Sequence, residues 1–145
     1  GELDERASRG EILQLGFHPD MHEYYRDCSA VVMPTWHEGM SNVLMEASAC
    51  ARPVIASNIS GCREIFEDGV TGYGFAPHSP EELIRTLRHF LTLDRSQRAA
   101  MGEAARQKMI EEFDREKVAA AYLEEIHAAM EEPKKDGGKK GNSET

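Results

Sequence analysis

AVVMPTWHEGMSNVLMEASACARPVIAS, the stretch from Ala30 to Ser57, carries the clearest fold signal in the sequence. It holds two apolar runs of strand length, AVVMP and PVIAS, and a helical pattern that begins near Ser41 lies between them. Neither run alternates polar with apolar residues, which is typical of strands that helices cover on both faces. The stretch therefore predicts a βαβ unit with two parallel, central strands.

The same alternation continues on both sides of this stretch. Before it, ILQLGF predicts a strand and DMHEYYRDC a helix; after it, CREIFEDG predicts a helix and GYGFAP a strand. Up to Ala76 the chain therefore predicts an α/β fold with a Rossmann-like parallel sheet and flanking helices.

Three further helices are predicted beyond Ala76, and they make the carboxyl-terminal region helical. The first is SPEELIRTLRHFL, whose apolar residues on one face are Leu83, Ile84, Leu87 and Leu91. Helical spacing marks the second by Met101, Ala105 and Met109, and the third by Val118, Tyr122, Ile126 and Met130. We predict one folded domain over residues 1–132 and a disordered, lysine-containing tail over 133–145, where no aliphatic or aromatic residue occurs.

Composition excludes several classes of protein. Seventeen basic residues against twenty-six acidic ones give a net charge of −9, which argues against a nucleic-acid partner. The three cysteines are odd in number and widely spaced, which argues against a disulfide framework or a zinc site. No stretch approaches eighteen apolar residues. We expect a cytoplasmic location, with the inner face of the membrane as an alternative for peripheral binding.

The loop WHEGMSN should leave the carboxyl end of the first strand of the βαβ unit, where open α/β sheets bind ligands. Ser41 is expected to cap the following helix, and Gly39 leaves room for a ligand to approach. The amides of Asn42, Val43 and Leu44 would then be free at the positive end of the helix dipole. This arrangement favours a phosphate or a developing anion.

Glu38 and Glu46 flank this loop with seven residues between them. Carboxylates accept hydrogen bonds and so suit hydroxyl groups, whereas they repel phosphate. A nucleotide sugar carries hydroxyl-bearing rings on both sides of a diphosphate, and it matches an order of acceptor, amides and acceptor. Glu46 would bind the ribose and Glu38 the sugar; Val43, Leu44 and Ala47 would form the buried face of the helix. The alternative is that both glutamates are merely solvated.

The stretch PTWHEGMSNVLMEASACARPVIASNISGCREIFEDGVTG, residues 34–72, resembles the carboxyl-terminal half of GT-B-fold retaining glycosyltransferases of family 4. The resemblance is strongest to enzymes of capsular and cell-surface polysaccharide synthesis, and it extends from about Ile12 through Ile126. The E-x7-E motif of that family falls on Glu38 and Glu46.

The resemblance implies a donor site for a nucleoside-diphosphate sugar in a cleft between two Rossmann-like domains. It implies that Glu46 binds the ribose, that Glu38, the candidate catalytic residue, lies near the donor sugar, and that the amides of residues 40–44 meet the sugar and the diphosphate. Gly16 and Phe17 would lie near the base. It also implies transfer with retention, no covalent nucleophile, no metal or other cofactor, and an acceptor that is a glycan or lipid-linked.

Some positions depart from the family pattern. The basic pair that neutralises the diphosphate and the acceptor-binding domain would precede Ile12, so the chain is expected to be truncated and inactive alone. ILQLGF would lack its neighbouring strand, and the exposed sheet edges would invite self-association. The final helix would have nothing to pack on. Ala51 stands where the family has glycine, and it would cost stability if that position requires a positive φ.

Other residues allow weaker hypotheses. His18, Asp20, His22 and Glu23 could ligate a metal, but Pro19 disfavours helical spacing of the histidines, and Asp20 suits a helix cap. Glu64, near the start of the predicted helix CREIFEDG, could orient the donor loop or simply cap that helix.

We therefore predict the carboxyl-terminal, nucleotide-sugar-binding portion of a retaining hexosyltransferase. The main alternative is a non-catalytic nucleotide-sugar or partner-binding module. A sugar-nucleotide epimerase or a phosphorylase of the same fold is disfavoured by EGMSNVLMEA, and an NAD-binding protein by the absence of GxGxxG.

Overall fold

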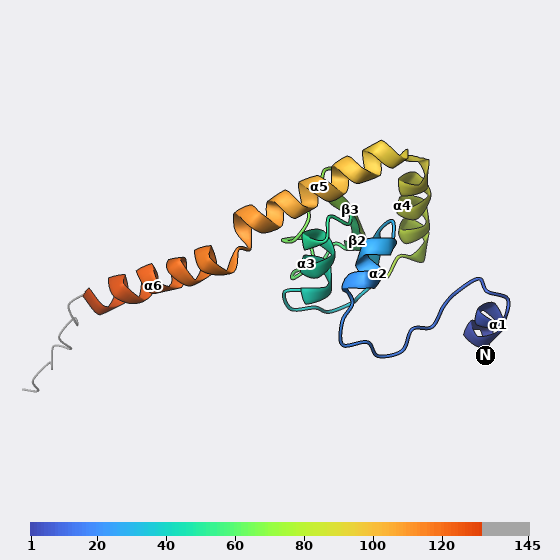
Figure 1. Ribbon diagram of the computed structural model, residues 1–145, viewed down its shortest axis with the longest axis horizontal. Coiled ribbons are helices and arrows are strands. Elements are labelled where there is room, and N and C mark those ends of the chain that lie inside the picture. The colour runs from blue at the N-terminus through green and yellow to red at the C-terminus, as the bar shows by residue number, and fades with distance from the viewer. Residues whose placement is uncertain (132–145) are drawn as a thin grey trace, which may run out of the picture.

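The computed structural model describes residues 1–131, and it has an α/β fold built on a three-stranded parallel sheet. The strands β1 (Val31–Met33), β2 (Val54–Ser57) and β3 (Gly72–Phe75) lie in the order β1-β2-β3 (Figure 1). All four residues of β2 are buried, as predicted for a central strand. The prediction is wrong for β1, which lies at an edge and leaves 39% of Val32 exposed.

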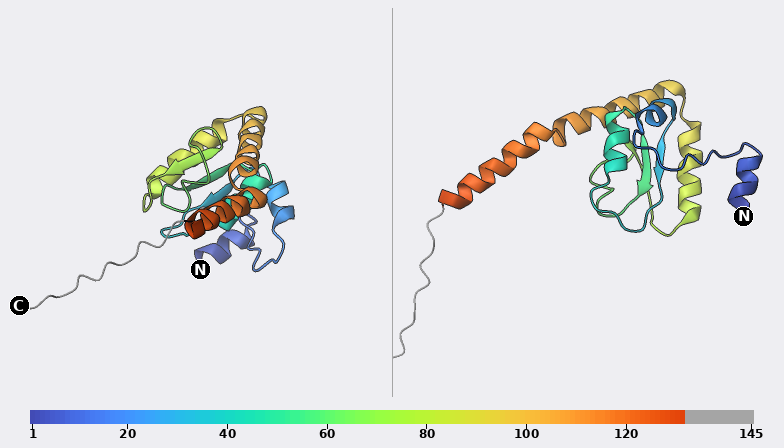
Figure 2. Two further views of the ribbon diagram at one scale, coloured as in Figure 1. Left: turned by 90° about the vertical axis from the view of Figure 1, so that its left-hand side faces the viewer. Right: turned by 60° about the horizontal axis from the view of Figure 1, so that its bottom comes forward.

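Helices cover both faces of the sheet, and β2 shows how the core is divided between them. Val54 and Ala56 pack in a cluster with side chains of α2 (His22–Asp27), α3 (Asn42–Ala49) and α5 (Arg95–Glu112). Ile55 points to the other face and packs with residues of α4 (Pro80–Thr92). Figure 2 shows α3 and α4 on opposite sides of the strands. The alternation within β2 therefore explains why an unbroken apolar run is needed there.

The helix α4 forms as its sequence predicts, but its buried face is rotated slightly. Ser79 caps the helix by accepting a hydrogen bond from the Glu82 amide at 3.3 Å, and Pro80 occupies the first turn. The buried or half-buried residues are Leu83, Leu87 and Phe90. Ile84 and Leu91 were predicted on this face, yet both are exposed. Phe90 takes the place of Leu91 because its ring fills the space beside Ile55.

The helix α5 lies across α3 and is seated by a glycine. Met101, Ala105 and Met109 are buried, as the helical spacing predicts. A Cβ atom on Gly102 would lie 2.1 Å from the carbonyl oxygen of Ala51, so only glycine allows this approach. At Gly102, the backbone of α5 therefore packs directly against the backbone of the turn between α3 and β2.

That turn is a Schellman motif with an alanine where glycine is favoured. The Ala51 amide donates to the Ser48 carbonyl oxygen, and the Arg52 amide donates to the Ala47 carbonyl oxygen, which is the paired pattern of the motif. Ala51 has a φ of 56°, so the condition under which an alanine here costs stability is met. A left-handed alanine is strained because its Cβ approaches the following carbonyl.

Replacing Ala51 by glycine is therefore expected to stabilise the domain by about 0.5–1 kcal/mol, since relief of the strain exceeds the entropy that glycine adds to the unfolded chain. Urea denaturation monitored by circular dichroism measures the change. Ala49→Gly, two residues earlier and inside α3, is the control and should lower stability by a similar amount. A loss of stability in Ala51→Gly would show that the turn carries no strain.

Two predicted elements do not form. ILQLGF is an extended segment without strand pairing, because among the described residues no strand lies beside it to complete the ladder. CREIFEDG is a series of turns rather than a helix. Gly61, just before it, has a φ of 88°, which breaks the right-handed helical path at its start. A short helix that was not predicted, α1 (Glu2–Ser8), has no buried residue.

The last helix, α6 (Arg115–Glu131), extends away from the sheet (Figure 1). Its apolar residues Val118, Tyr122, Ile126 and Met130 are exposed, which confirms the expectation that this helix finds nothing to pack on. The predicted tail at 133–145 lies outside the described residues. Within residues 1–131, no helix is long and apolar enough to cross a membrane.

Candidate donor site

The loop from Pro34 to Met40 leaves the carboxyl end of β1 and leads into α3, as predicted. Ser41 is buried, and its hydroxyl oxygen accepts a hydrogen bond from the Leu44 amide at 3.4 Å. The prediction that three amides are free is therefore wrong for Leu44. The amides of Asn42 and Val43 remain, since the first turn of a helix offers them no carbonyl oxygen. Two donors thus mark the positive end of α3.

A second turn, around Gly61, supports this loop through direct backbone contacts. The Ser41 amide donates to the Gly61 carbonyl oxygen at 3.1 Å. The two backbones are so close that a Cβ on Gly61 would lie 1.9 Å from the Gly39 carbonyl oxygen and 2.6 Å from that of Glu38. Sequence reasoning missed Gly61, although the Ser60-Gly61 pair is a turn signal. The donor loop is therefore positioned by a glycine twenty residues further along the chain.

Glu64 holds the supporting turn. Its carboxylate accepts hydrogen bonds from the Gly61 amide at 2.7 Å and from the Ser60 hydroxyl at 3.3 Å. Its own backbone amide, and then that of Gly61, hold the pKa of this carboxyl below its usual value. No helix forms here, but the bond from the Gly61 amide to the Glu64 carboxylate, three residues later, is the capping-type contact expected of an acid in a first turn. Because Gly61 also contacts the donor loop, the same bond is consistent with the hypothesis that Glu64 orients that loop.

Glu38 is exposed at the surface of the loop, and the buried Cys62 lies beneath it. Burial raises the pKa of the Cys62 thiol, and the negative charges of Glu38 and Glu64 raise it further. Cys62 is thus a protonated, fully buried core residue, as predicted. The carboxylate of Glu38 stays free to meet a ligand.

Glu46 lies one and a half turns into α3 and is also exposed. Its carboxylate accepts a hydrogen bond from the hydroxyl of Tyr25, on α2, at 3.2 Å. Burial and the charge of Glu46 raise the pKa of Tyr25 to about 12, so this phenol stays a donor. Val43 was predicted on the buried face of α3 but is 38% exposed. Leu44, Ala47 and Ser48 form that face, which leaves Val43 at the surface with the donor loop.

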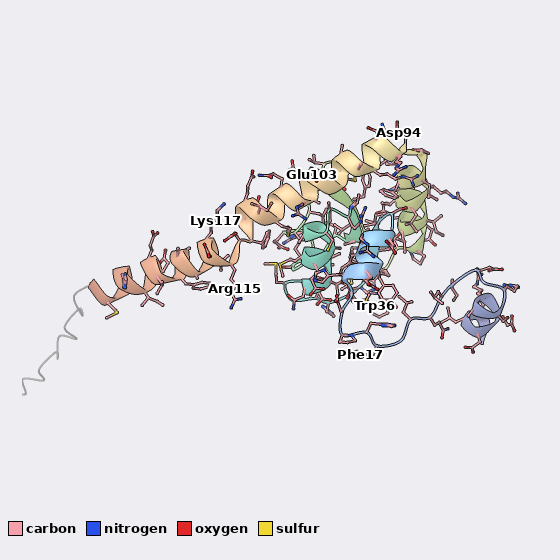
Figure 3. The ribbon with its side chains drawn as sticks, in the orientation of Figure 1. Phe17, Trp36, Asp94, Glu103, Arg115 and Lys117 are labelled. Atoms are coloured by element: carbon pink, nitrogen blue, oxygen red, sulfur yellow. The ribbon has the colours of Figure 1, made fainter. Side chains whose placement is uncertain are left out.

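Gly16 and Phe17 lie in the extended segment before α2, and the structure does not pack them against the loop. Gly16 has a φ of 68° with no atom near its Cβ position, and Phe17 is 92% exposed. Figure 3 shows Phe17 on this outer segment. The predicted contact of these residues with a base stays a prediction.

A cavity of about 230 Å³ opens at the same edge of the sheet, where Pro34, Ser57 and Phe75 end or follow the three strands. Trp36 and His78 form one wall, with ring centroids 4.6 Å apart. Trp36 is 66% exposed, so it is a surface aromatic beside the loop rather than a core residue.

Within residues 1–131, no three histidine, cysteine, aspartate or glutamate side chains lie close enough together to hold a metal ion. Asp20 accepts a hydrogen bond from the His22 amide at 2.9 Å at the start of α2, the capping-type role suggested by its position. His18 contacts the Leu15 carbonyl oxygen and the Tyr24 hydroxyl.

Comparison with known proteins identifies the family that has this arrangement. A family model described as glycosyl transferases group 1 matches residues 3–108. The chain belongs to that family. The matched region of this group 1 domain includes the sheet, the loop with Glu38, and α3 to most of α5.

Two curated relatives are enzymes of different specificity. The D-inositol 3-phosphate glycosyltransferase of Streptomyces bingchenggensis is 33% identical over 111 residues, which are 77% of this chain and 24% of that enzyme. The glycogen synthase of Mycobacterium tuberculosis is 31% identical over 112 residues, which are 77% of this chain and 27% of that enzyme. The group 1 domain thus spans about a quarter of the length of these two relatives.

Solved structures show the same fold. HepE of Anabaena, crystallised with UDP, superposes with a TM-score of 0.77 and 25% identity, over 88% of this chain and 36% of HepE. Sucrose-phosphate synthase of Thermosynechococcus elongatus superposes with a TM-score of 0.77 and 23% identity, over 89% of this chain and 33% of that enzyme. The fold of the group 1 domain matches the carboxyl-terminal domain of GT-B glycosyltransferases.

Proposed function

We propose that the group 1 domain is the donor-binding part of a retaining glycosyltransferase of family 4, which takes a sugar from a nucleoside-diphosphate donor. The observation that carries this proposal is the loop at residues 38–41. It is fixed by Gly61 and leads into a helix whose first two amides are free. Two exposed carboxylates, Glu38 and Glu46, flank those amides.

Each part of the site then has a chemical role. The amides of Gly39, Met40, Asn42 and Val43, together with the positive end of α3, stabilise the negative charge that develops on the departing diphosphate. Leu44 contributes through its packing, since Ser41 occupies its amide. This reaction requires positioning and charge stabilisation rather than a covalent intermediate or a cofactor.

The carboxylates recognise the two sugars of the donor. Glu38 accepts a hydrogen bond from the transferred sugar, and Glu46 accepts from the ribose hydroxyls with the carboxylate oxygen that the Tyr25 hydroxyl leaves free. Gly16 and Phe17 meet the base, for which their exposure leaves a free surface. Uracil is the first base to test, because HepE was crystallised with UDP and with UDP-glucose.

The acceptor is proposed to be a glycan or a lipid-linked molecule of surface-polysaccharide synthesis, bound through a second domain. A peripheral site on the inner face of the membrane would suit such an acceptor. The relatives named above are glycosyltransferases, which favours an enzyme over a non-catalytic binding module. We also propose that copies of the chain can associate through the exposed edge of β1.

Glu46→Gln is expected to weaken UDP binding by about tenfold, because a charge-assisted hydrogen bond to the ribose is replaced by a neutral one. An amide-resolved NMR titration of the whole chain with UDP, and then with GDP, measures the affinity and locates the nucleotide. In the parent chain, the shifts should be confined to residues 16–17 and 39–46.

Tyr25→Phe is the matched control for this experiment. It removes the only hydrogen bond that Glu46 receives from a side chain in residues 1–131, yet it keeps the carboxylate. Its affinity for UDP should stay within about twofold of the parent, with a loss of stability of about 1 kcal/mol. Equal UDP affinity in Glu46→Gln and the parent chain would exclude Glu46 from the site. Shifts elsewhere in the parent chain would refute the proposed donor site.

A further inference from the structure

A larger cavity, of about 530 Å³, lies at the opposite edge of the sheet from the donor loop. Ser29 and Pro53, which precede β1 and β2, line it on one side, and residues of the corner between α4 and α5 line it on the other. Figure 3 shows the two ends of the fold, with Asp94 at this corner and Trp36 near the donor loop. A ligand here would therefore not compete with the sugar donor for space.

Three arginines line this cavity, although the chain as a whole carries a net charge of −9. Arg52 comes from the turn before β2, and Arg95 and Arg98 come from the first two turns of α5. Within residues 1–131, no carboxylate lies within ion-pair distance of any of the three, whereas Arg6, Arg9, Arg26, Arg63 and Arg85 each have such a partner. Positive charge is thus gathered here without compensation.

The hydrogen bonds of the guanidinium groups leave several donors for a ligand. The Nε of Arg52 donates to the Tyr25 carbonyl oxygen at 2.7 Å, which fixes the side chain and leaves its terminal nitrogens. The Nη2 of Arg98 donates to the Leu91 carbonyl oxygen at 3.0 Å, and the group stacks on Phe90 at 5.0 Å. Its Nε is buried and has no partner within the described residues. A buried N–H donor without a partner destabilises the fold unless a ligand or a water molecule accepts a hydrogen bond from it.

Neighbouring groups within the described residues form no ion pair with these guanidinium groups. Asp94 is the nearest acid in the sequence, and its carboxylate accepts a hydrogen bond from the Gln97 amide as the cap of α5. Burial raises the pKa of the Cys28 thiol although Arg52 opposes the shift, so the thiol stays protonated and adds no negative charge. The cavity therefore presents guanidinium donors and a serine hydroxyl to any anion that enters.

We propose that this cavity binds a small phosphate ester, with the phosphate group held by Arg52, Arg95 and Arg98. Planar guanidinium groups match the oxygens of phosphate in pairs, and three of them suit its double charge. The volume is in the range of small-molecule sites and leaves room for an organic group beside the phosphate. The overall negative charge disfavours a long polyanion such as a nucleic acid.

The test is an amide-resolved NMR titration of the whole chain with glycerol 3-phosphate, and separately with inorganic phosphate, at constant ionic strength. Saturable shifts are expected at Ser29 and residues 95–99, without shifts at residues 39–46. Arg95→Gln is the variant to use, because Arg95 is exposed and makes no hydrogen bond within the described residues, so its loss should not unfold the chain. The affinity for glycerol 3-phosphate should fall at least about fivefold.

Arg88→Gln, on the exposed side of α4 and outside the cavity, is the matched control, since it removes the same charge. It should change the affinity by less than about twofold. An equal loss in both variants would mean that only net charge matters and would overturn the proposal. Shifts limited to residues 39–46, the absence of saturation, or binding of inorganic phosphate but not of the ester would overturn it as well.

Discussion

Gly61→Ala should abolish detectable UDP binding and lower the free energy of unfolding by about 2–4 kcal/mol. The new methyl group would collide with the backbone carbonyls of Gly39 and Glu38, at 1.9 and 2.6 Å. Backbone atoms cannot move aside as a flexible side chain can, so the donor loop must lift from the turn below it. Urea denaturation and the UDP titration measure the two effects.

Gly69→Ala separates the collision from the effect of backbone conformation. Gly69 also has a positive φ, 78°, but a Cβ there meets no atom within 4 Å. Its replacement should lower the free energy of unfolding by only about 1–2 kcal/mol, the strain of a left-handed alanine, and should leave the UDP affinity unchanged. If both variants bind UDP with the affinity of the parent chain, then Gly61 does not support the donor loop.

Gly102→Ala has the second largest expected effect, and its sign is opposite to that of helix propensity. Alanine inside a helix is favoured over glycine by about 1 kcal/mol. Here the methyl group would lie 2.1 Å from the Ala51 carbonyl oxygen and 3.3 Å from the Cδ of Pro53. We expect a net loss of about 2–3 kcal/mol in urea denaturation, because α5 must move off α3.

Glu103→Ala is the control for this change. Glu103 is the next residue of α5, and its side chain is exposed (Figure 3). The substitution should alter stability by no more than about 0.5 kcal/mol. A Gly102→Ala variant as stable as the parent would show that α5 does not depend on close backbone contact. The UDP affinity of folded Gly102→Ala should equal that of the parent, since α5 seats at the far end of α3 from the donor loop.

Much of the fold could be predicted because its signals are local. Ser41 and Ser79 mark their helices by capping chemistry, and β2 by an unbroken apolar run. ILQLGF could not be judged in this way, because a strand needs a partner and the sequence of one segment does not contain it. The turns after Gly61 were missed for a related reason, since the positive φ there belongs to a contact with a distant loop.

In the candidate site too, local features could be predicted and long-range contacts could not. The place of the loop, the cap at Ser41 and the exposure of Glu38 and Glu46 follow from the pattern of strand and helix. The contact of Tyr25 with Glu46 joins two helices, and no spacing in the sequence indicates it. The roles of the individual residues toward a sugar donor remain predictions for the titrations.

The parallel sheet also constrains the order in which the chain can assemble. β1 and β2 cannot pair until the chain between them has turned back as α3, and β3 must then return over the turns at residues 58–71. The helix α5 packs on the turn at Ala51 through Gly102, across about fifty residues of intervening chain, so we expect this long-range contact to form late. Loosening this late contact should therefore hasten unfolding far more than it delays folding, and the seat of α5 sets the lifetime of the native domain.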